Sequence, residues 1–280
     1  MPELPEVDHI VRYVRPRLVG RRITTLETPG GLPRGHDAPG TSPLKLVRGR
    51  TIRAVDRRAK LILLRLDQRT LVLHLKLTGK CWIRDADSAP AKSTRLRLVL
   101  DDGQALDVED ARKLGWFRLL EDEPLVAMLE KNGPEPLDPA FTLAFFRGLI
   151  AKKRGRLKPL LLDPTFVAGI GNIYADEVLF AAKLHPRRLA STLAPREVGA
   201  LHRAIVTSLK RAVADRTEEV PDQTRVGSGA RGASKHIKTR QVFQRAGEPC
   251  PRCGETILRT VVATRGTYLC PRCQPAPGPA

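Results

Sequence analysis

Residues 250–273 of the chain read CPRCGETILRTVVATRGTYLCPRC. This stretch contains two Cys-x-x-Cys pairs with 16 residues between them, formed by Cys250, Cys253, Cys270 and Cys273. Such spacing is typical of a tetrahedral zinc site, and four thiolates fill the coordination sphere, so the predicted Zn²⁺ ion is structural. Residues 257–262 and 268–269 alternate like the strands of a β-hairpin. A redox dithiol is the alternative, although that chemistry needs only one pair beside a βαβ unit.

The composition around this stretch points to a polyanionic partner. The 280 residues include 49 Lys and Arg against 30 Asp and Glu, a formal net charge of +19, and the pI is near 10.4. Residues 225–273 alone hold ten Lys or Arg and only two acidic residues. Nucleic acid is the commonest partner of such a surface; a merely soluble basic surface is the alternative. The apolar fraction of 41% is enough to bury a core, which argues against wholesale disorder.

Towards the N-terminus the hydrophobic pattern changes twice. Between residues 21 and 120, period-two segments such as 51–55, 71–75 and 95–100 predict an antiparallel sandwich or barrel. A helix precedes it, limited by Pro16, and its apolar face is formed by Val7, Ile10, Val11 and Val14. After residues 133–136, GPEP, helical spacing covers 141–152, 172–183 and 195–213. The chain is therefore predicted to be an α+β protein.

These changes predict five segments along the chain. An N-terminal β-sandwich with its leading helix covers 1–133 and a helical domain covers 134–222. A glycine-rich flexible loop follows at 223–242, then the zinc finger at 243–274 and a disordered tail at 275–280.

The first residues combine an amine with two carboxylates. Removal of Met1 would leave Pro2 as a free secondary amine, whose ordinary pKa of ~7.7–8.0 leaves a sizeable unprotonated fraction at neutral pH. Such an amine can attack an electrophilic sugar carbon and form an iminium. Glu3 is adjacent and Glu6 lies one helical turn further on, so one carboxylate can transfer a proton while the other holds the amine. Proline and glutamate are also ordinary first-turn residues, which is the alternative.

Five motifs together resemble the formamidopyrimidine-DNA glycosylase family, which includes endonuclease VIII. They occur in the family's order and are PELPEV at 2–7, RRAK at 57–60, HLKLTG at 74–79, GIGNIYADE at 169–177 and the paired-cysteine finger. The resemblance implies an N-terminal β-sandwich, a helix-two-turn-helix domain, a lesion-capping loop and a β-hairpin zinc finger. It also implies a bifunctional DNA glycosylase and AP lyase of base excision repair that acts on damaged double-stranded DNA.

The resemblance assigns roles along the reaction. Pro2 would be the nucleophile that attacks C1′ of the damaged nucleotide, Glu3 the acid acting at the sugar and Glu6 a supporting carboxylate. Lys60 would transfer protons in β-elimination, and Arg265 would serve δ-elimination and phosphate binding. By position alone, Lys60 merely flanks a strand and Arg265 is a hairpin-turn cation. The implied product is a one-nucleotide gap with phosphates at both ends.

The family's DNA contacts fall on six further residues, His74, Leu77, Arg112, Leu114, Lys158 and Asn172. The first and the last two match phosphate-contacting positions, although His74 also suits a satisfied strand histidine. Because a base must leave the duplex before a terminal amine can reach its sugar, the family fills the hole with Met, Arg and Phe. Leu77, Arg112 and Leu114 stand at those positions here, and leucines suit a wedge, but no aromatic ring remains for stacking.

Two other departures concern substrate preference. Ser93 and Arg95 lie in a segment where relatives often carry histidines, and residues 226–233 do not follow the pattern of the lesion-capping loop. The PELPE start, rather than a PEGPE-like one, favours oxidised purines, 8-oxoguanine and formamidopyrimidine, as substrates. Oxidised pyrimidines or abasic sites, as for endonuclease VIII, are one alternative. A non-catalytic lesion-binding paralogue is the other, and the retained Pro2, Glu3, Lys60 and Arg265 argue against it.

The expected setting follows from composition and resemblance together. No apolar run approaches the ~18 residues of a membrane span, and the N-terminus lacks the features of a signal peptide. We therefore expect a cytoplasmic, nucleoid-associated monomer with damaged double-stranded DNA as its partner, no membrane partner, and one structural zinc ion as its cofactor.

Overall fold

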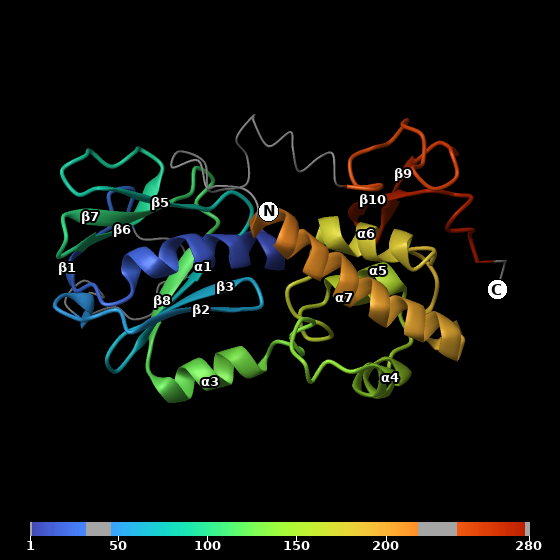
Figure 1. Ribbon diagram of the computed structural model, residues 1–280, viewed down its shortest axis with the longest axis horizontal. Helices are drawn as coiled ribbons and strands as arrows, with labels where there is room; N and C mark the ends of the chain where they lie inside the picture. Colours follow the sequence, from blue (N-terminus) through green and yellow to red (C-terminus); the bar gives the residue numbers. More distant parts are fainter. Residues whose placement is uncertain (1, 32–45, 218–239, 278–280) are drawn as a thin grey trace. The chain divides into compact units, whose positions relative to one another are not determined.

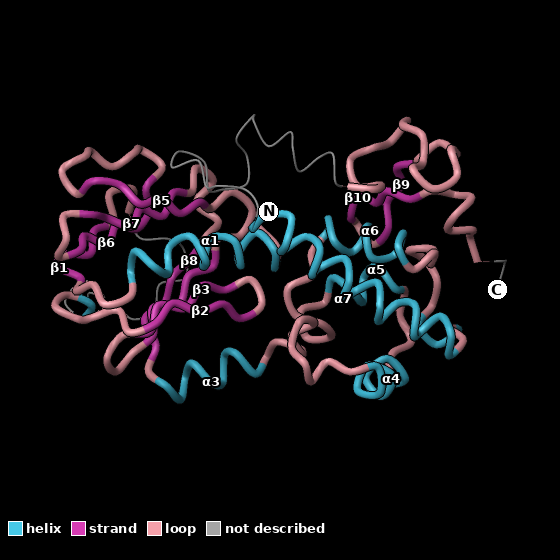
Figure 2. The backbone as a smooth tube through the Cα atoms, in the orientation of Figure 1, coloured by secondary structure: helices cyan, strands magenta, loops and turns pink. Residues whose placement is uncertain are grey.

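The computed structural model describes residues 2–31, 46–217 and 240–277, and the chain falls into two compact units. Of the described residues, those up to 131 and those at 215–217 form the first unit, and residues 132–214 and 240–277 form the second. Strands dominate the first unit and helices the second, apart from one hairpin (Figure 2). The predicted α+β class, with a β-sandwich, a helical part and a hairpin finger, is confirmed.

Two antiparallel sheets of four strands each make up the first unit (Figure 1). One sheet has the order β1-β6-β7-β5, formed by β1 Ile23–Glu27, β6 Thr94–Leu100, β7 Gln104–Glu109 and β5 Lys80–Asp85. The other has the order β2-β3-β4-β8, formed by β2 Ala54–Arg58, β3 Leu61–Arg65, β4 Thr70–His74 and β8 Trp116–Leu120.

Period-two alternation explains why the two sheets stack. Leu98 of β6 and Ile62 of β3 lie in the same apolar core, which fills the space between the sheets. The neighbour Leu63 points to the opposite face of β3 and packs with Leu125 of helix α3, Asp122–Glu130. One sheet is therefore buried on both faces, which accounts for the nearly continuous apolar sequence of β3.

Helix α1, Leu4–Leu18, runs alongside β2 and β3 (Figure 1). Its predicted apolar face lies in the core of the sandwich, through Val7, Ile10, Val11 and Val14. The helix continues two residues past Pro16, because a proline near the end removes only one backbone hydrogen bond and the N–H of Val19 closes the last turn on Arg15.

The strand expected at 51–55 was placed too early, since β2 begins at Ala54. Ile52 instead accepts a backbone hydrogen bond from Gly20 at 2.8 Å and donates one to Arg21 at 2.9 Å. The first part of this segment therefore ties the end of α1 to the sandwich before the strand starts.

The second unit is a helical bundle followed by the finger. Its helices are α4 Leu143–Ala151, α5 Leu157–Leu162, α6 Asn172–Ala181 and α7 Pro195–Thr217, with the short 3₁₀ helix η1 Ala190–Thr192. Three of them coincide with the predicted helical segments, whereas α3 and α5 were not predicted. Phe146, Phe166 and Ile205 are fully buried and form part of the apolar interior of the unit.

The finger consists of strands β9, Leu258–Val262, and β10, Arg265–Leu269, joined by a two-residue turn. Both turn residues, Ala263 and Thr264, have positive φ values of 46° and 66°. This backbone is the one that twisted hairpins require, but it costs energy for residues other than glycine.

Some sequence predictions lie outside the described residues. These are the lesion-capping loop as far as residue 239, including 226–233, and the last three residues of the predicted tail. Within the described part of the chain, no helix is both long and apolar enough to cross a membrane.

Candidate functional site

The N-terminal residues form a buried cluster at the start of α1. Pro2 is buried and Glu3, the N-cap of α1, is 1% exposed. The Glu6 carboxylate accepts a hydrogen bond from the backbone N–H of Glu3 at 2.8 Å, as part of a capping box. The same carboxylate forms an ion pair with Arg216 near the end of α7. The structure thus brings the predicted Pro2, Glu3 and Glu6 together and holds both carboxylates in fixed positions.

Lys60 and His74 lie at the same end of the neighbouring strands β3 and β4. Lys60 is the last residue of the β2–β3 turn, and its neighbour Leu61 pairs with His74 across the ladder. His74 accepts a hydrogen bond at Nδ1 from the Lys76 backbone at 2.9 Å, and its ring lies 5.5 Å from that of Trp116. Burial, then the charges of Lys76 and Lys60, lower the pKa of His74 to about 3. His74 is therefore a neutral imidazole at neutral pH, with Nε2–H as its donor.

The three predicted wedge residues lie on two loops of the sandwich. Leu77 is 40% exposed in the loop 75–79, and Leu114 is 41% exposed in the loop 110–115, where Arg112 is also exposed. Exposed large apolar side chains are costly in water, and they indicate a contact surface when they cluster. Asp110, which sequence reasoning missed, accepts hydrogen bonds from both loops.

In the second unit, three more predicted residues meet at the finger hairpin. The Lys158 ammonium is fully buried and donates to the Gly266 carbonyl at 2.9 Å. The Asn172 amide donates to the same carbonyl at 3.0 Å. Both side chains therefore hold Gly266, the residue that follows Arg265. The side chain of Arg265 itself is exposed.

Lys158 has further partners inside the unit. It donates to the Thr267 hydroxyl at 2.9 Å and forms a 2.7 Å ion pair with Asp176, which is also fully buried. Burial raises the pKa of Asp176 to about 7, against the opposing effect of Lys158. In this structure Lys158 supports the hairpin from within and does not face solvent.

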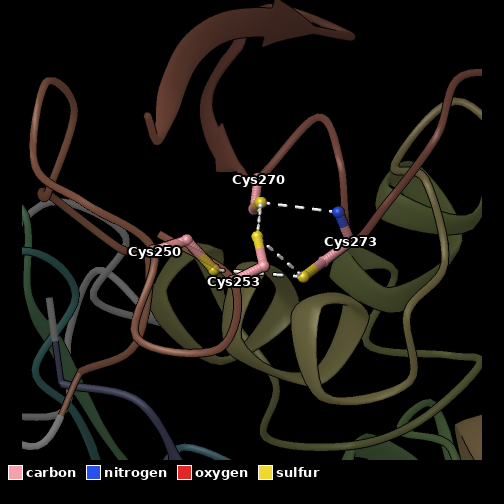
Figure 3. A group of neighbouring side chains, drawn as sticks. All are labelled: Cys250, Cys253, Cys270 and Cys273. Atoms are coloured by element: carbon pink, nitrogen blue, oxygen red, sulfur yellow. Dashed lines mark hydrogen bonds between the residues drawn. The ribbon is translucent and has the colours of Figure 1, made fainter. Parts of the chain in front are cut away.

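The four predicted metal ligands converge at the base of the finger (Figure 3). All four sulfur atoms lie within 4.8 Å of one another, and neighbouring pairs are 3.5 to 4.0 Å apart. Tetrahedral Zn–S bonds of ~2.3 Å place sulfurs about 3.8 Å apart, so the cluster fits a zinc ion. Cys250, Cys253, Cys270 and Cys273 thus form a closed site for one structural zinc ion, as predicted from their spacing.

Helix α6 supplies two anchoring residues that the sequence analysis did not single out. Asp176 accepts a hydrogen bond from the Tyr268 backbone of the finger at 3.0 Å. Glu177 accepts three backbone hydrogen bonds of 2.9 to 3.0 Å from residues 241–243. Both belong to the GIGNIYADE motif. Two acidic residues on a predicted helix with an apolar sequence were therefore the signal from which these anchoring residues could have been predicted.

Three family models match successive parts of the chain. They are the formamidopyrimidine-DNA glycosylase N-terminal domain over residues 1–117, the formamidopyrimidine-DNA glycosylase H2TH domain over 132–223, and the zinc finger found in FPG and IleRS over 247–276. The formamidopyrimidine-DNA glycosylase of Roseiflexus sp. (strain RS-1) is 42% identical over 276 residues, covering 98% of this chain and 100% of the relative. That of Symbiobacterium thermophilum is 42% identical over 281 residues, covering 99% and 90%.

Solved structures agree with these relatives. The Lactococcus lactis formamidopyrimidine-DNA glycosylase bound non-covalently to DNA with an AP site has a TM-score of 0.85 and 32% identity, covering 98% of this chain and 100% of that one. A variant of the same enzyme in complex with Fapy-dG containing DNA gives a TM-score of 0.87 and 33% identity over the same shares. Both comparisons span the β-sandwich, the helical part and the finger, so the chain belongs to the formamidopyrimidine-DNA glycosylase family.

Proposed function

We propose that this chain is a bifunctional DNA glycosylase and AP lyase of base excision repair, which excises oxidised purines such as 8-oxoguanine and formamidopyrimidine from duplex DNA. The observation that carries the proposal is Pro2 beside the buried Glu3, in a chain that matches enzymes of this name over 98% of its length. The complex of a Lactococcus lactis relative with Fapy-dG containing DNA supports the substrate class.

The reaction begins at the secondary amine that Pro2 carries after removal of Met1. Its nitrogen attacks C1′ of the flipped-out nucleotide, the bond from C1′ to the base breaks, and the base leaves with a proton. The nitrogen then loses its own proton, Glu3 protonates the ring oxygen O4′, and the bond between C1′ and O4′ breaks, which opens the sugar and leaves a C1′=N iminium with a positive charge on nitrogen. Glu6 keeps the geometry of the site, because it bonds the Glu3 backbone on one side and Arg216 on the other.

The iminium then drives strand scission. Lys60 takes a proton from C2′, the electrons move towards the iminium, and the bond between C3′ and the phosphate oxygen breaks. In a second elimination a proton leaves C4′ and the bond between C5′ and its phosphate oxygen breaks, with Arg265 binding a phosphate of the lesion. Water then hydrolyses the iminium and releases the sugar from Pro2. The zinc ion holds the finger that carries Arg265 and takes no part in these steps.

The remaining residues bind the DNA. His74 donates Nε2–H to a phosphate as a neutral group, while Asn172 and Lys158 serve phosphate binding through the finger hairpin that they hold. Leu77, Leu114 and Arg112 enter the space left by the flipped nucleotide, and Arg112 hydrogen-bonds the orphaned base. The enzyme works as a monomer in the cytoplasm, at the nucleoid.

Borohydride trapping tests this proposal, because borohydride reduces the iminium to a stable covalent adduct. The protein is incubated with duplexes that each hold one lesion: 8-oxoguanine, a formamidopyrimidine, an oxidised pyrimidine or an abasic site. We expect adducts with both purine lesions and with the abasic site. A stronger adduct with the oxidised pyrimidine would move the substrate to the endonuclease VIII class, and no adduct with any duplex would leave a lesion-binding protein without lyase activity.

The variant Pro2→Gly tests the nucleophile. A primary amine can lose a proton and give a neutral imine, which withdraws electrons less than the permanent iminium of proline. We expect scission to slow at least tenfold, or ~1.4 kcal/mol in activation free energy, while the affinity for an abasic-site duplex stays within about twofold. Loss of affinity together with scission would instead indicate that Pro2 is a structural residue of α1.

A further inference from the structure

The two loops that carry the wedge residues have no ladder hydrogen bonds of their own. Loop 75–79 follows β4, and loop 110–115 connects β7 to β8. Each contains a lysine with positive φ, Lys76 at 51° and Lys113 at 55°. Such backbone costs about 1 kcal/mol or more for a residue with a side chain, so it persists only where neighbouring contacts hold it.

One carboxylate, that of Asp110, binds both loops. Oδ1 accepts a hydrogen bond from the Thr78 hydroxyl in the first loop and one of 3.2 Å from the Arg112 backbone in the second. Oδ2 accepts two further bonds of 2.6 Å, from the backbone N–H groups of Leu114 and Gly115. All four donors lie in the two wedge loops: two are backbone groups of the wedge residues Arg112 and Leu114, and the other two are on Thr78 and Gly115, directly beside Leu77 and Leu114.

The ionised form of Asp110 is the one that accepts these bonds. Burial opposes ionisation, but the hydrogen bonds from Gly115, Thr78, Leu114 and Arg112 outweigh it and lower the pKa of Asp110. A carboxylate can accept two bonds at each oxygen, whereas an asparagine amide would turn one oxygen into a donor. The clamp therefore depends on a charged side chain at this position.

Arg95 fixes the backbone of Asp110 from behind. Its Nε donates to the Asp110 carbonyl at 2.9 Å, and its Nη1 donates to the Gly30 carbonyl at 2.9 Å. A Cβ atom on Gly30 would lie 1.8 Å from Nη1, so only glycine leaves room for this guanidinium. The Asp110 N–H completes the frame by donating to the Ser93 carbonyl at 2.8 Å.

We propose that Asp110 is a positioning residue that sets the distance between Leu77 on one loop and Arg112 and Leu114 on the other. The inference rests on the proposed function, since it concerns how the void in the duplex is filled. Excision from a duplex needs the clamp, whereas attack on an abasic site in a single strand does not, because no stacked partner has to be replaced.

The Thr78→Val variant removes the bond between the loops and keeps the shape of the side chain. The experiment compares excision of 8-oxoguanine from a duplex with borohydride trapping at an abasic site in a single-stranded oligonucleotide. We expect duplex excision to fall about tenfold, which corresponds to ~1.4 kcal/mol and to one lost hydrogen bond to a charged acceptor. Single-strand trapping should stay within about twofold, and Thr78→Ser should restore duplex excision. Asp110→Asn should act in the same direction and more strongly.

Asp102→Asn is the matched control. Asp102 also accepts a backbone hydrogen bond in a turn of the sandwich, from Gln104 at 3.1 Å, and it pairs with Arg21. This variant should leave both readouts unchanged, and the melting temperature of each variant is measured alongside.

Two results would overturn the clamp. One is a Thr78→Val protein with normal duplex excision, and the other is an equal loss in both assays, which would indicate general damage to the sandwich. Failure of the proposed function itself looks different, because the unmodified protein would then form no adduct with either substrate.

Discussion

At the scale of single residues, the two wedge loops and the strands beside them contain polar side chains of two kinds. Some are neutral at neutral pH, and others are ionised but already hydrogen-bonded within the protein. His74 is a polar group without charge at neutral pH, since its pKa lies at about 3. Asp110 is the opposite case, a carboxylate held ionised by four donors. If these residues face DNA as proposed, the positive charge comes from Lys and Arg, while His74 and Asp110 contribute hydrogen bonds of fixed direction.

The low pKa of His74 has a measurable effect on stability. In the unfolded chain His74 takes up a proton near its ordinary pKa of about 6.5, while in the folded chain it stays neutral down to about pH 3. Its contribution to folding is thus complete above pH 6.5 and is lost progressively as the pH falls towards 3. We expect His74→Gln to reduce the drop in melting temperature between about pH 7 and pH 4.5, compared with the unmodified protein.

Proton NMR of the His74 ring supplies the direct check. Its C2–H resonance should not shift between about pH 5 and pH 8. Titration of that resonance near pH 6.5 would contradict the neutral imidazole, and phosphate binding by a cationic His74 would then have to be considered.

At the scale of elements, the finger is a hairpin that cannot stand alone. Two-stranded hairpins are marginal in water, and the turn of this one is strained at Ala263 and Thr264. Its interior is one compact cluster that Phe180 of α6, Val242 and Ile257 form with the cysteines, and Tyr268 packs against it. Zinc binding, worth ~10–16 kcal/mol in isolated zinc fingers, is the main source of its stability.

Removal of zinc is therefore expected to unfold the finger and leave the helices. A strong chelator should release the ion, retain most of the helical far-UV circular dichroism, and lower affinity for an abasic-site duplex at least tenfold, because Arg265 loses its fixed position. Fluorescence anisotropy with a labelled duplex measures the affinity. Re-addition of Zn²⁺ should restore it. Metal-free protein that binds with unchanged affinity would show that the hairpin holds Arg265 without the ion.

The same elements show what the sequence could predict. The period-two segments became β4 and β6, and helix α6 begins at Asn172, as expected from its spacing. These features depend on residues close together in the chain. Helix α3 was not predicted because its helical hydrophobic pattern is weak. Some of its apolar residues pack against β3 and β4, but Val126 lies on the exposed side.

In the site, local chemistry was predictable and partners distant in sequence were not. The four cysteines and the cluster at Pro2 follow from short spacings. The burial of Lys158 depends on Gly266 and Asp176, the first of which is 108 residues away. The clamp at Asp110 likewise depends on Thr78, which is 32 residues away. The sequence shows that a lysine or an aspartate is present. Only the fold determines whether that side chain bonds to other residues of the protein or remains available to a ligand.

At the scale of the whole molecule, a net charge of +19 predicts DNA binding that weakens steeply with salt. Each phosphate neutralised by a protein cation contributes about 0.9 to the slope of log K against log salt concentration. The size of the slope therefore counts cations that meet phosphates. Lys158 does not belong in this count, because it is fully buried and its ammonium already donates to the Gly266 carbonyl and the Thr267 hydroxyl inside the second unit.

The slope of log K against log salt concentration can therefore distinguish two roles of Lys158 in DNA binding, namely support of the finger hairpin and direct contact with a phosphate. Replacing Lys158 by Met and Asp176 by Asn together leaves no unpaired buried charge, but it removes a donor to Gly266 beside Arg265. We expect this double variant to bind an abasic-site duplex more weakly at every salt concentration from about 50 to 200 mM, with an unchanged slope. Arg265→Ala should weaken binding and also reduce the slope by about 0.9. If the double variant reduced the slope by the same amount, Lys158 would leave Asp176 in the complex and meet a phosphate itself, and its buried position here would describe only the free protein.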